Sequence, residues 1–232
     1  MNDFTHFPNR LPIFPLPMVF FPGQVRTLHI FEPRYKDLLQ MCIHTGSPFG
    51  IVLENRATKT EPAPMPHEIG VLAHIFQVAR QPDDTFLIQI YGGERFRVRH
   101  FYHDMPFLQA EIDSAPLSQT DTDLALRLFD TVSELLEAYL DALTQASGFD
   151  FQIPDIPETP EQLGYLTAVA LQINNDQKQT LLSKASLPEL LRDEIIFLRS
   201  ELDLMDWINN TIESPINNIF SGFGPENAIS LN

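Results

Sequence analysis

The sequence contains a single cysteine, Cys42, so it cannot form a disulfide within one chain. A lone cysteine is typical of proteins in a reducing compartment, and we predict a cytoplasmic location. No run approaches the roughly 18 apolar residues that a spanning helix needs. The most apolar segment, residues 11–22, contains four prolines, which exclude a helix there. The sequence therefore predicts neither a membrane segment nor a signal peptide.

Lysine is scarce as well, with four in the chain, and none of them follows a glycine. The ATP-binding loop G-x-x-x-x-G-K-[ST] is therefore absent, as are the dinucleotide motif G-x-G-x-x-G and the serine hydrolase motif G-x-S-x-G. Ser183 and Lys184 are adjacent, and neighbouring helical side chains point about 100° apart, so we do not expect a Ser-Lys dyad. These absences predict that the chain is not an enzyme, with no catalytic residues and no cofactor.

Metal-binding side chains are also not arranged as a site. His100 and His103 lie beside Asp104, but residues three apart on a strand point to opposite faces. Cys42 lies on the apolar face of a predicted helix and is interpreted as a small core residue. We therefore expect no metal site.

Charge is distributed unevenly along the chain. Residues 1–110 contain ten acidic and ten basic side chains, whereas residues 111–232 contain twenty-one acidic and five basic ones, so the net charge of −16 lies in the second half. This shift predicts two regions of different character with a boundary near residue 115. Such an acidic half repels phosphate backbones and disfavours nucleic-acid binding.

Residues 10–112 show mainly the two-residue alternation of β-strands. The pattern predicts strands at 24–30, 49–54, 69–79, 85–91, 94–102 and 107–112, and one short helix at 33–43 that ends before Gly46. The pair Gly92-Gly93 favours a tight turn, so 85–91 and 94–102 are predicted to form a hairpin. Residues 55–68 predict an exposed loop. Five or six strands favour a compact barrel or sandwich.

After residue 122 the period changes to that of helices. The first helix is predicted from Leu124, Leu128, Val132, Leu135, Tyr139 and Leu143. Thr159-Pro160-Glu161-Gln162 has the form of a capping box and predicts a helix to about residue 173, followed by a short one near 176–183. The last helix carries a seam, suited to antiparallel packing, of Leu191, Ile195, Leu198, Leu202 and Met205. Residues 214–232 are predicted to be a flexible tail.

Arg95, Arg97 and Arg99 alternate along one predicted strand, with Phe96 and Val98 on its other face. We interpret the arginines as the solvated face of a half-buried strand. The alternative is that this stripe binds phosphates, which would make the protein an RNA-binding domain with a PUA-like barrel. The sequence alone leaves both open.

Several long motifs resemble the N-terminal, substrate-binding domain of Lon-type proteases. Residues 11–23 (LPIFPLPMVFFPG) and 28–35 (LHIFEPRY) match the opening of that family, and Phe49–Leu53 and Gly93–Val98 match later motifs. Residues 179–182 and 187–204 look like its helical segment. The resemblance covers about residues 10–210.

The resemblance implies an α+β fold, with a PUA-like β-barrel subdomain and one short helix followed by an α-helical bundle. We predict the β-rich subdomain at 1–115, the bundle at 116–213 and the tail at 214–232. In full-length proteases of this family, this region contacts substrates, upstream of separate ATPase and protease domains. Those domains are missing from this sequence, so the resemblance implies a free-standing LON domain rather than a protease.

These inferences predict a non-catalytic protein- or peptide-binding module. Its expected partners are unfolded or damaged polypeptides, with a protease or chaperone as the recipient if it is an adaptor in proteolysis; self-association stays open. Predicted polypeptide contacts are Met18, Phe20, Phe21 and Phe31, together with the groove between the subdomains. The motif residues predicted to be structural are Pro17, Pro22, Gly23, Glu32, Pro33, Arg34, Tyr35, Gly93, Arg95 and Phe96.

Overall fold

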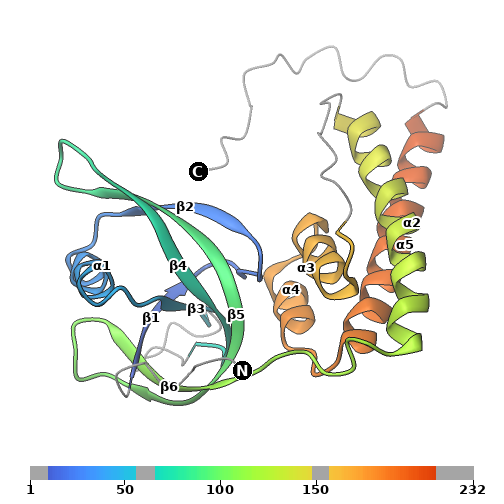
Figure 1. Ribbon diagram of the computed structural model, residues 1–232. Helices are drawn as coiled ribbons and strands as arrows, with labels where there is room; N and C mark the ends of the chain where they lie inside the picture. The colour runs from blue at the N-terminus through green and yellow to red at the C-terminus, as the bar shows by residue number, and fades with distance from the viewer. Residues whose placement is uncertain (1–9, 56–65, 148–156, 213–232) are drawn as a thin grey trace.

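The computed structural model describes residues 10–55, 66–147 and 157–212 (Figure 1). The strands are β1 (Leu11–Leu16), β2 (Val25–Ile30), β3 (Phe49–Leu53), β4 (Ile69–Arg80), β5 (Phe86–Tyr102) and β6 (Leu108–Ser114). Helix α1 (Pro33–Thr45) lies between β2 and β3 in the chain. The later helices are α2 (Asp123–Ser147), α3 (Pro160–Ala170), α4 (Asn175–Leu182) and α5 (Leu187–Ile212). The predicted α+β order is confirmed.

The six strands form one sheet that returns on itself. Their order is β2-β5-β4-β3-β1-β6, and an additional pairing of β5 with β6 closes five of the strands into a barrel-like ring. β1 and β3 pair in parallel, and the other neighbours pair antiparallel. β2 lies beside the first part of β5 only, because the second part of β5 pairs with β6.

The predicted hairpin at Gly92-Gly93 is wrong, because β5 continues through both glycines. The backbone of Gly92 instead bonds to the segment before β2: its N–H donates to the Gln24 carbonyl and its carbonyl accepts the Gly23 N–H, both at 2.8 Å. A Cβ at Gly92 would collide with the carbonyl oxygen of Phe21. The glycine therefore allows two backbones to approach closely. The hairpin connects β4 and β5, through a turn in which Asp84 has a φ of 63°.

The helix boundaries follow local signals in the sequence. α1 begins after Glu32 with Pro33 in its first turn and ends at Gly46, whose φ of 65° is left-handed. At α3, the Thr159 side chain accepts the N–H of Gln162, as the predicted capping motif requires. The sequence interpretation missed a reciprocal capping box at α4, made by Asn174 and Gln177.

The four helices that follow β6 form two layers beside the sheet. Figure 1 shows α3 and α4 between the sheet and the long pair α2 and α5, which run side by side in the same direction. The expected antiparallel packing of the last helix is therefore wrong for this pair, and a parallel bridge between Ser118 and Ser186 precedes the two helices. The predicted seam of α5 does face the core, with Leu191 and Leu198 fully buried.

One apolar cluster joins the two halves of the molecule. It includes sheet residues such as Ile51 and Ile90 and helix residues such as Leu136 and Leu190. A second cluster, around Phe96, belongs to the sheet alone. We call the sheet with α1 the β-rich unit and α2 to α5 the helical unit.

Two predictions fall largely or wholly outside the described residues, namely the loop at 55–68 and the tail at 214–232. Within the described ranges, every helix is too short or too polar to traverse a lipid bilayer.

Candidate polypeptide-binding groove

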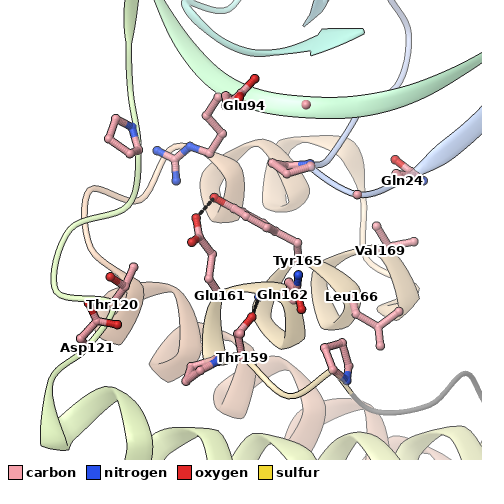
Figure 2. A pocket seen from close by; sticks show the side chains of 17 residues that line it. Gln24, Glu94, Thr120, Asp121, Thr159, Glu161, Gln162, Tyr165, Leu166 and Val169 are labelled. Atoms are coloured by element: carbon pink, nitrogen blue, oxygen red, sulfur yellow. Dashed lines mark hydrogen bonds between the residues drawn. The ribbon is translucent and has the colours of Figure 1, made fainter. Parts of the chain in front are cut away.

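A groove of about 810 Å³ lies where the β-rich unit meets α3 (Figure 2). From the β-rich unit it is lined by Pro22, Gly23, Gln24, Gly93, Glu94 and Arg95. From the helical unit and its connections it is lined by Pro116, Thr120, Asp121, Pro157, Thr159, Pro160, Glu161, Gln162, Tyr165, Leu166 and Val169. Thr120 and Asp121 lie toward one end, and Leu166 and Val169 lie toward the other.

Residues of α3 from Pro160 to Val169 form the helical wall of the groove. The Thr159 cap fixes where the helix begins, and this places Glu161, Tyr165 and Leu166 along the groove. The Tyr165 hydroxyl donates to Glu161 Oε1 at 3.3 Å, as Figure 2 shows. Burial raises the pKa of Tyr165, which the neighbouring Arg95 partly lowers. The phenol therefore stays protonated at neutral pH.

Arg95 is 4% exposed and belongs to the opposite wall. Its Nη2 donates to the carbonyl oxygen of Lys184 at 2.8 Å, which links β5 to the segment between α4 and α5. The prediction that Arg95 lies on a solvated strand face is wrong, because the helical unit covers it. Arg97 and Arg99 are exposed and lie close to the carboxylates of Glu68 and Asp113 respectively.

The three arginines therefore do not form the continuous, solvent-exposed stripe on which the RNA-binding alternative depended. The groove itself has three carboxylates, those of Glu94, Asp121 and Glu161, against the single guanidinium of Arg95. This balance opposes the binding of a phosphate backbone.

The four residues predicted to contact a polypeptide differ in their exposure to solvent. Phe20 and Phe21 are 2% and 1% exposed and pack in the core, so they do not form an accessible surface. Gly23, which follows them after Pro22, has a left-handed φ of 76°. Met18 is half-buried, and Phe31 is exposed. Of the four, only Phe31 lies well exposed.

Most of the motif residues have visible packing or hydrogen-bonding partners. Glu32 and Arg34 form an exposed ion pair at 2.7 Å, and Tyr35 stacks on Phe14 of β1 at 4.0 Å. Phe96 is fully buried. The carbonyl of Pro17 accepts a hydrogen bond from Asn175 Nδ2 at 2.7 Å.

Three other motif residues, Pro22, Gly23 and Gly93, line the groove beside Arg95. The α3 residues Glu161, Gln162, Tyr165, Leu166 and Val169, which form the opposite wall, were not identified from the sequence. The Thr159 capping motif located the start of α3, but no local signal indicated which side of it faces the sheet.

The residues weighed above as possible nucleophiles or bases are buried or paired with other residues. Cys42 is buried, its Sγ lies 3.9 Å from the Pro48 carbonyl oxygen, and burial raises its pKa to about 12. Lys184 pairs with Asp193, while the Ser183 hydroxyl accepts from Gln179. Among the described residues, no three metal-ligating side chains lie together.

A second exposed apolar surface, on the outer face of the sheet, shares no residue with the lining of the groove. Val25, Phe76 and Tyr91 are 61%, 52% and 43% exposed. Val25 pairs with Tyr91 across β2 and β5, and the Tyr91 ring stacks on His74 at 4.8 Å. This outer face serves below as a matched control for the groove.

Comparison with known proteins places the fold in a family. Lon protease 2 of Myxococcus xanthus is 21% identical over 212 residues, which are 90% of this chain and 26% of the relative. Lon protease of Phenylobacterium zucineum is 26% identical over 196 residues, which are 83% of this chain and 25% of the relative. The chain thus spans about a quarter of the length of these relatives.

Two solved structures have the same fold. A Lon N-terminal domain protein from Xanthomonas campestris has a TM-score of 0.61 and 22% identity, and the match covers 81% of this chain and 98% of that one. The N-terminal domain of Mycobacterium avium complex Lon protease has a TM-score of 0.62 and 20% identity, with 82% and 98% covered. The family model of the ATP-dependent protease La (LON) substrate-binding domain matches residues 10–200. The chain therefore belongs to the LON substrate-binding domain family.

Proposed function

We propose that this chain binds polypeptides in the groove between the sheet and α3, without catalysing a reaction on them. The observation that carries the proposal is the groove itself. Its volume of about 810 Å³ lies within the roughly 300–1,000 Å³ that is typical of ligand sites. Apolar side chains such as Leu166 and Val169 line it together with hydrogen-bonding groups such as Gln24 and Gln162. Membership of a substrate-binding family supports the same role.

The expected ligands are unfolded segments, because an extended chain can place its side chains and backbone inside a groove of about 810 Å³, whereas a folded protein has its apolar side chains in its own core. Such a segment gains apolar contact along α3 and hydrogen bonds from the polar side chains. Delivery of the bound chain to a protease or chaperone is the role that we propose for the complex.

The test is binding of the chain to lactalbumin that has been reduced and carboxamidomethylated, with native lactalbumin as the folded control. Two variants obstruct the groove: Leu166→Arg places a charge in it, and Gln162→Trp fills it from an exposed position. Phe76→Arg makes the same kind of change on the outer face. We expect the groove variants to bind at least about tenfold more weakly, with Phe76→Arg unchanged.

Calorimetric titration measures the affinities, and the melting temperatures of the variants show whether they fold. Loss of binding in Phe76→Arg alone would assign the site to the outer face and overturn the groove. Equal binding of native and unfolded lactalbumin would overturn the preference for unfolded segments.

A further inference from the structure

β2 lies at an open end of the sheet (Figure 1). It pairs with β5 alone, and on its other side no strand pairs with it among the described residues. All of its residues pair with β5 without a register shift. A strand edge of this kind presents backbone N–H and C=O groups that can pair with a further extended chain. β2 therefore offers a straight edge for such a chain.

The hydrogen bonds between β4 and β5 determine which backbone groups of β2 point outward. Just beyond the ends of these two strands, the Gln81 N–H donates to the Thr85 carbonyl at 2.8 Å. Bonded positions recur every second residue in an antiparallel ladder, so Leu87 also faces β4 and Ile88 faces β2. Ile88 lies opposite Leu28, which therefore faces β5. The residues of β2 that alternate with Leu28 turn their backbone groups to the free side, and these are Val25, Thr27 and His29.

These three residues have one free N–H and one free C=O each. The Gly92 N–H donates to the Gln24 carbonyl, which places Gln24 toward β5 and agrees with the alternation. No backbone hydrogen bond joins Val25, Thr27 or His29 to another described segment on the free side, and all three residues are exposed. Unpaired backbone groups at the spacing of a strand match those of another strand. The partner that fits this edge is therefore an extended polypeptide.

Exposed apolar side chains lie at both ends of this edge. Val25 is 61% exposed at the first end. Phe31, which directly follows the strand, is 58% exposed, and its ring lies 5.6 Å from that of His29. Opposite side chains on paired strands have Cβ atoms about 4.5–5.5 Å apart, so an added strand brings its own side chains against both residues. Apolar side chains are expected at those two positions of the ligand.

The edge of β2 is continuous with the groove. Gly23 and Gln24 line the groove, and they directly precede Val25 in the chain. A polypeptide that pairs with β2 can therefore continue into the groove as one extended segment. A second copy of this protein is a less suitable occupant, because each copy has a net charge of −16 and the two repel each other.

The outer part of β4 is a less suitable edge. Its pairing with β3 ends at Ala73, so the rest of the strand also has a side without a partner strand among the described residues. A register shift between Ile75 and Gln77 interrupts that side, and such bulges commonly protect an edge from strand addition. Val78 lies opposite Ile88. Because Ile88 faces β2, Val78 turns its N–H to the free side of β4.

We propose that the free edge of β2 pairs with an extended segment of the bound polypeptide, while the continuation of that segment occupies the groove. The inference rests on the proposed function and adds a second surface, at which the main chain of the ligand is recognised. Main-chain pairing tolerates many sequences, and Val25 and Phe31 add a preference for apolar side chains beside them.

Proline tests the backbone contact, because it has no N–H and its ring obstructs an added strand. Thr27→Pro removes an outward N–H and should leave the hydrogen bonds between β2 and β5 in place. Val78→Pro makes the same change on the free side of β4 and is the matched control. In calorimetric titration we expect Thr27→Pro to bind carboxamidomethylated lactalbumin at least about fivefold more weakly than the parent, with Val78→Pro unchanged.

Amide hydrogen exchange of the parent protein, measured by NMR, tests the same contact without a variant. Binding of carboxamidomethylated lactalbumin should slow exchange at the outward amides of Val25, Thr27 and His29. The amides of Arg26 and Leu28 already face β5 and should change little. This measurement decides if the melting temperature of Thr27→Pro shows that the variant does not fold.

The possible failures are distinguishable. Binding by folded Thr27→Pro as tight as that of the parent, or outward amides that exchange equally fast in the complex, overturns pairing with β2 and leaves the groove intact. Weaker binding by Val78→Pro alone assigns the added strand to β4. Protection of the outward amides that rises with protein concentration, without lactalbumin, assigns the edge to a second copy. Absence of lactalbumin binding by the parent overturns the proposed function itself.

Discussion

The β-rich unit and the helical unit differ in how exposed their polar side chains are and in whether these side chains have partners. In the β-rich unit most charged side chains lie at the surface, as Arg10 and Asp104 do where they pair at 2.6 Å, and the buried Arg95 lies where the helical unit covers the sheet. In the helical unit Glu194 of α5 is fully buried, and neither of its carboxylate oxygens has a hydrogen-bond partner. Thr167 of α3 and Ser133 of α2 also have buried hydroxyl groups without a partner.

This difference indicates which forces limit the stability of each unit. Exposed ion pairs contribute about 0–1 kcal/mol each, so the β-rich unit depends on its apolar packing and on close backbone contacts. A buried carboxyl group without partners opposes folding, so the helical unit must offset that cost by packing. The groove lies between the two units and depends on both.

The largest effect is expected from Leu190→Ala on α5. Leu190 is fully buried, lies close to Gly164 of α3, and belongs to the apolar cluster that continues into the sheet. We expect the free energy of unfolding to fall by about 2–5 kcal/mol. Because the cluster is shared, amide hydrogen exchange should become faster in the β-rich unit as well as in the helices.

Leu72→Ala is the matched control, since Leu72 belongs to the sheet-only cluster. Its effect on exchange should be concentrated in the β-rich unit. If Leu190→Ala accelerates exchange in the helices and leaves the sheet protected, the two units are separately folding domains, divided near residue 115 as the sequence predicts.

The next effect tests the close backbone contacts of the β-rich unit. Gly92→Ala should lower the free energy of unfolding by about 2–3 kcal/mol, because the new methyl group meets the backbone carbonyl of Phe21. Gly93→Ala should cost less than about 1 kcal/mol, since its methyl group meets the ring end of His74, which can move. Urea denaturation of the two variants measures the difference. Equal effects would indicate that β5 and the turn before β2 can move apart without lowering the free energy of unfolding.

Gly92 and Gly93 also show why the sequence predicts the order of the helices and strands better than it predicts the connections between them. Apolar periodicity located α2 and α5, and a capping motif located the start of α3, because burial on one helix face and a helix cap are both local patterns. A glycine pair is an ambiguous signal: it suits a turn, and it equally suits a strand against which another backbone packs. Which of these two structures forms at Gly92 depends on its contact with Phe21, about seventy residues earlier in the chain. A local sequence pattern does not indicate such a contact.

The site was less predictable than the fold for the same reason. The motif that contains Arg95 was recognised, but an alternating Arg-x-Arg-x-Arg pattern is the same whether solvent or another unit covers one of its members. Phe20 and Phe21 were expected to contact a ligand because they are large and apolar, and those properties equally favour the core. The groove is made by the docking of α3 on the sheet, which is a long-range event.

The smallest effect is expected at Glu194, where the comparison between the units can be tested by pH. Burial raises the pKa of Glu194 well above its ordinary value, and the neighbouring Asp193 carboxylate raises it further. The folded state therefore binds a proton over a pH range in which the unfolded state has released it. By linkage, the contribution of Glu194 to stability falls as the pH rises from about 4.3 through the folded-state pKa.

Glu194→Gln removes this dependence without changing the size of the side chain. At pH 8 the variant should be more stable than the parent by about 1–2 kcal/mol, because a buried amide avoids the cost of ionisation, and near pH 4.5 the two should converge. Urea denaturation at several pH values measures the difference. Glu189→Gln, on the exposed face of the same helix, should show no such trend. A constant offset between Glu194→Gln and the parent across this range would mean that Glu194 does not titrate differently in the folded and unfolded states, and the contrast drawn between the two units would then rest on packing alone.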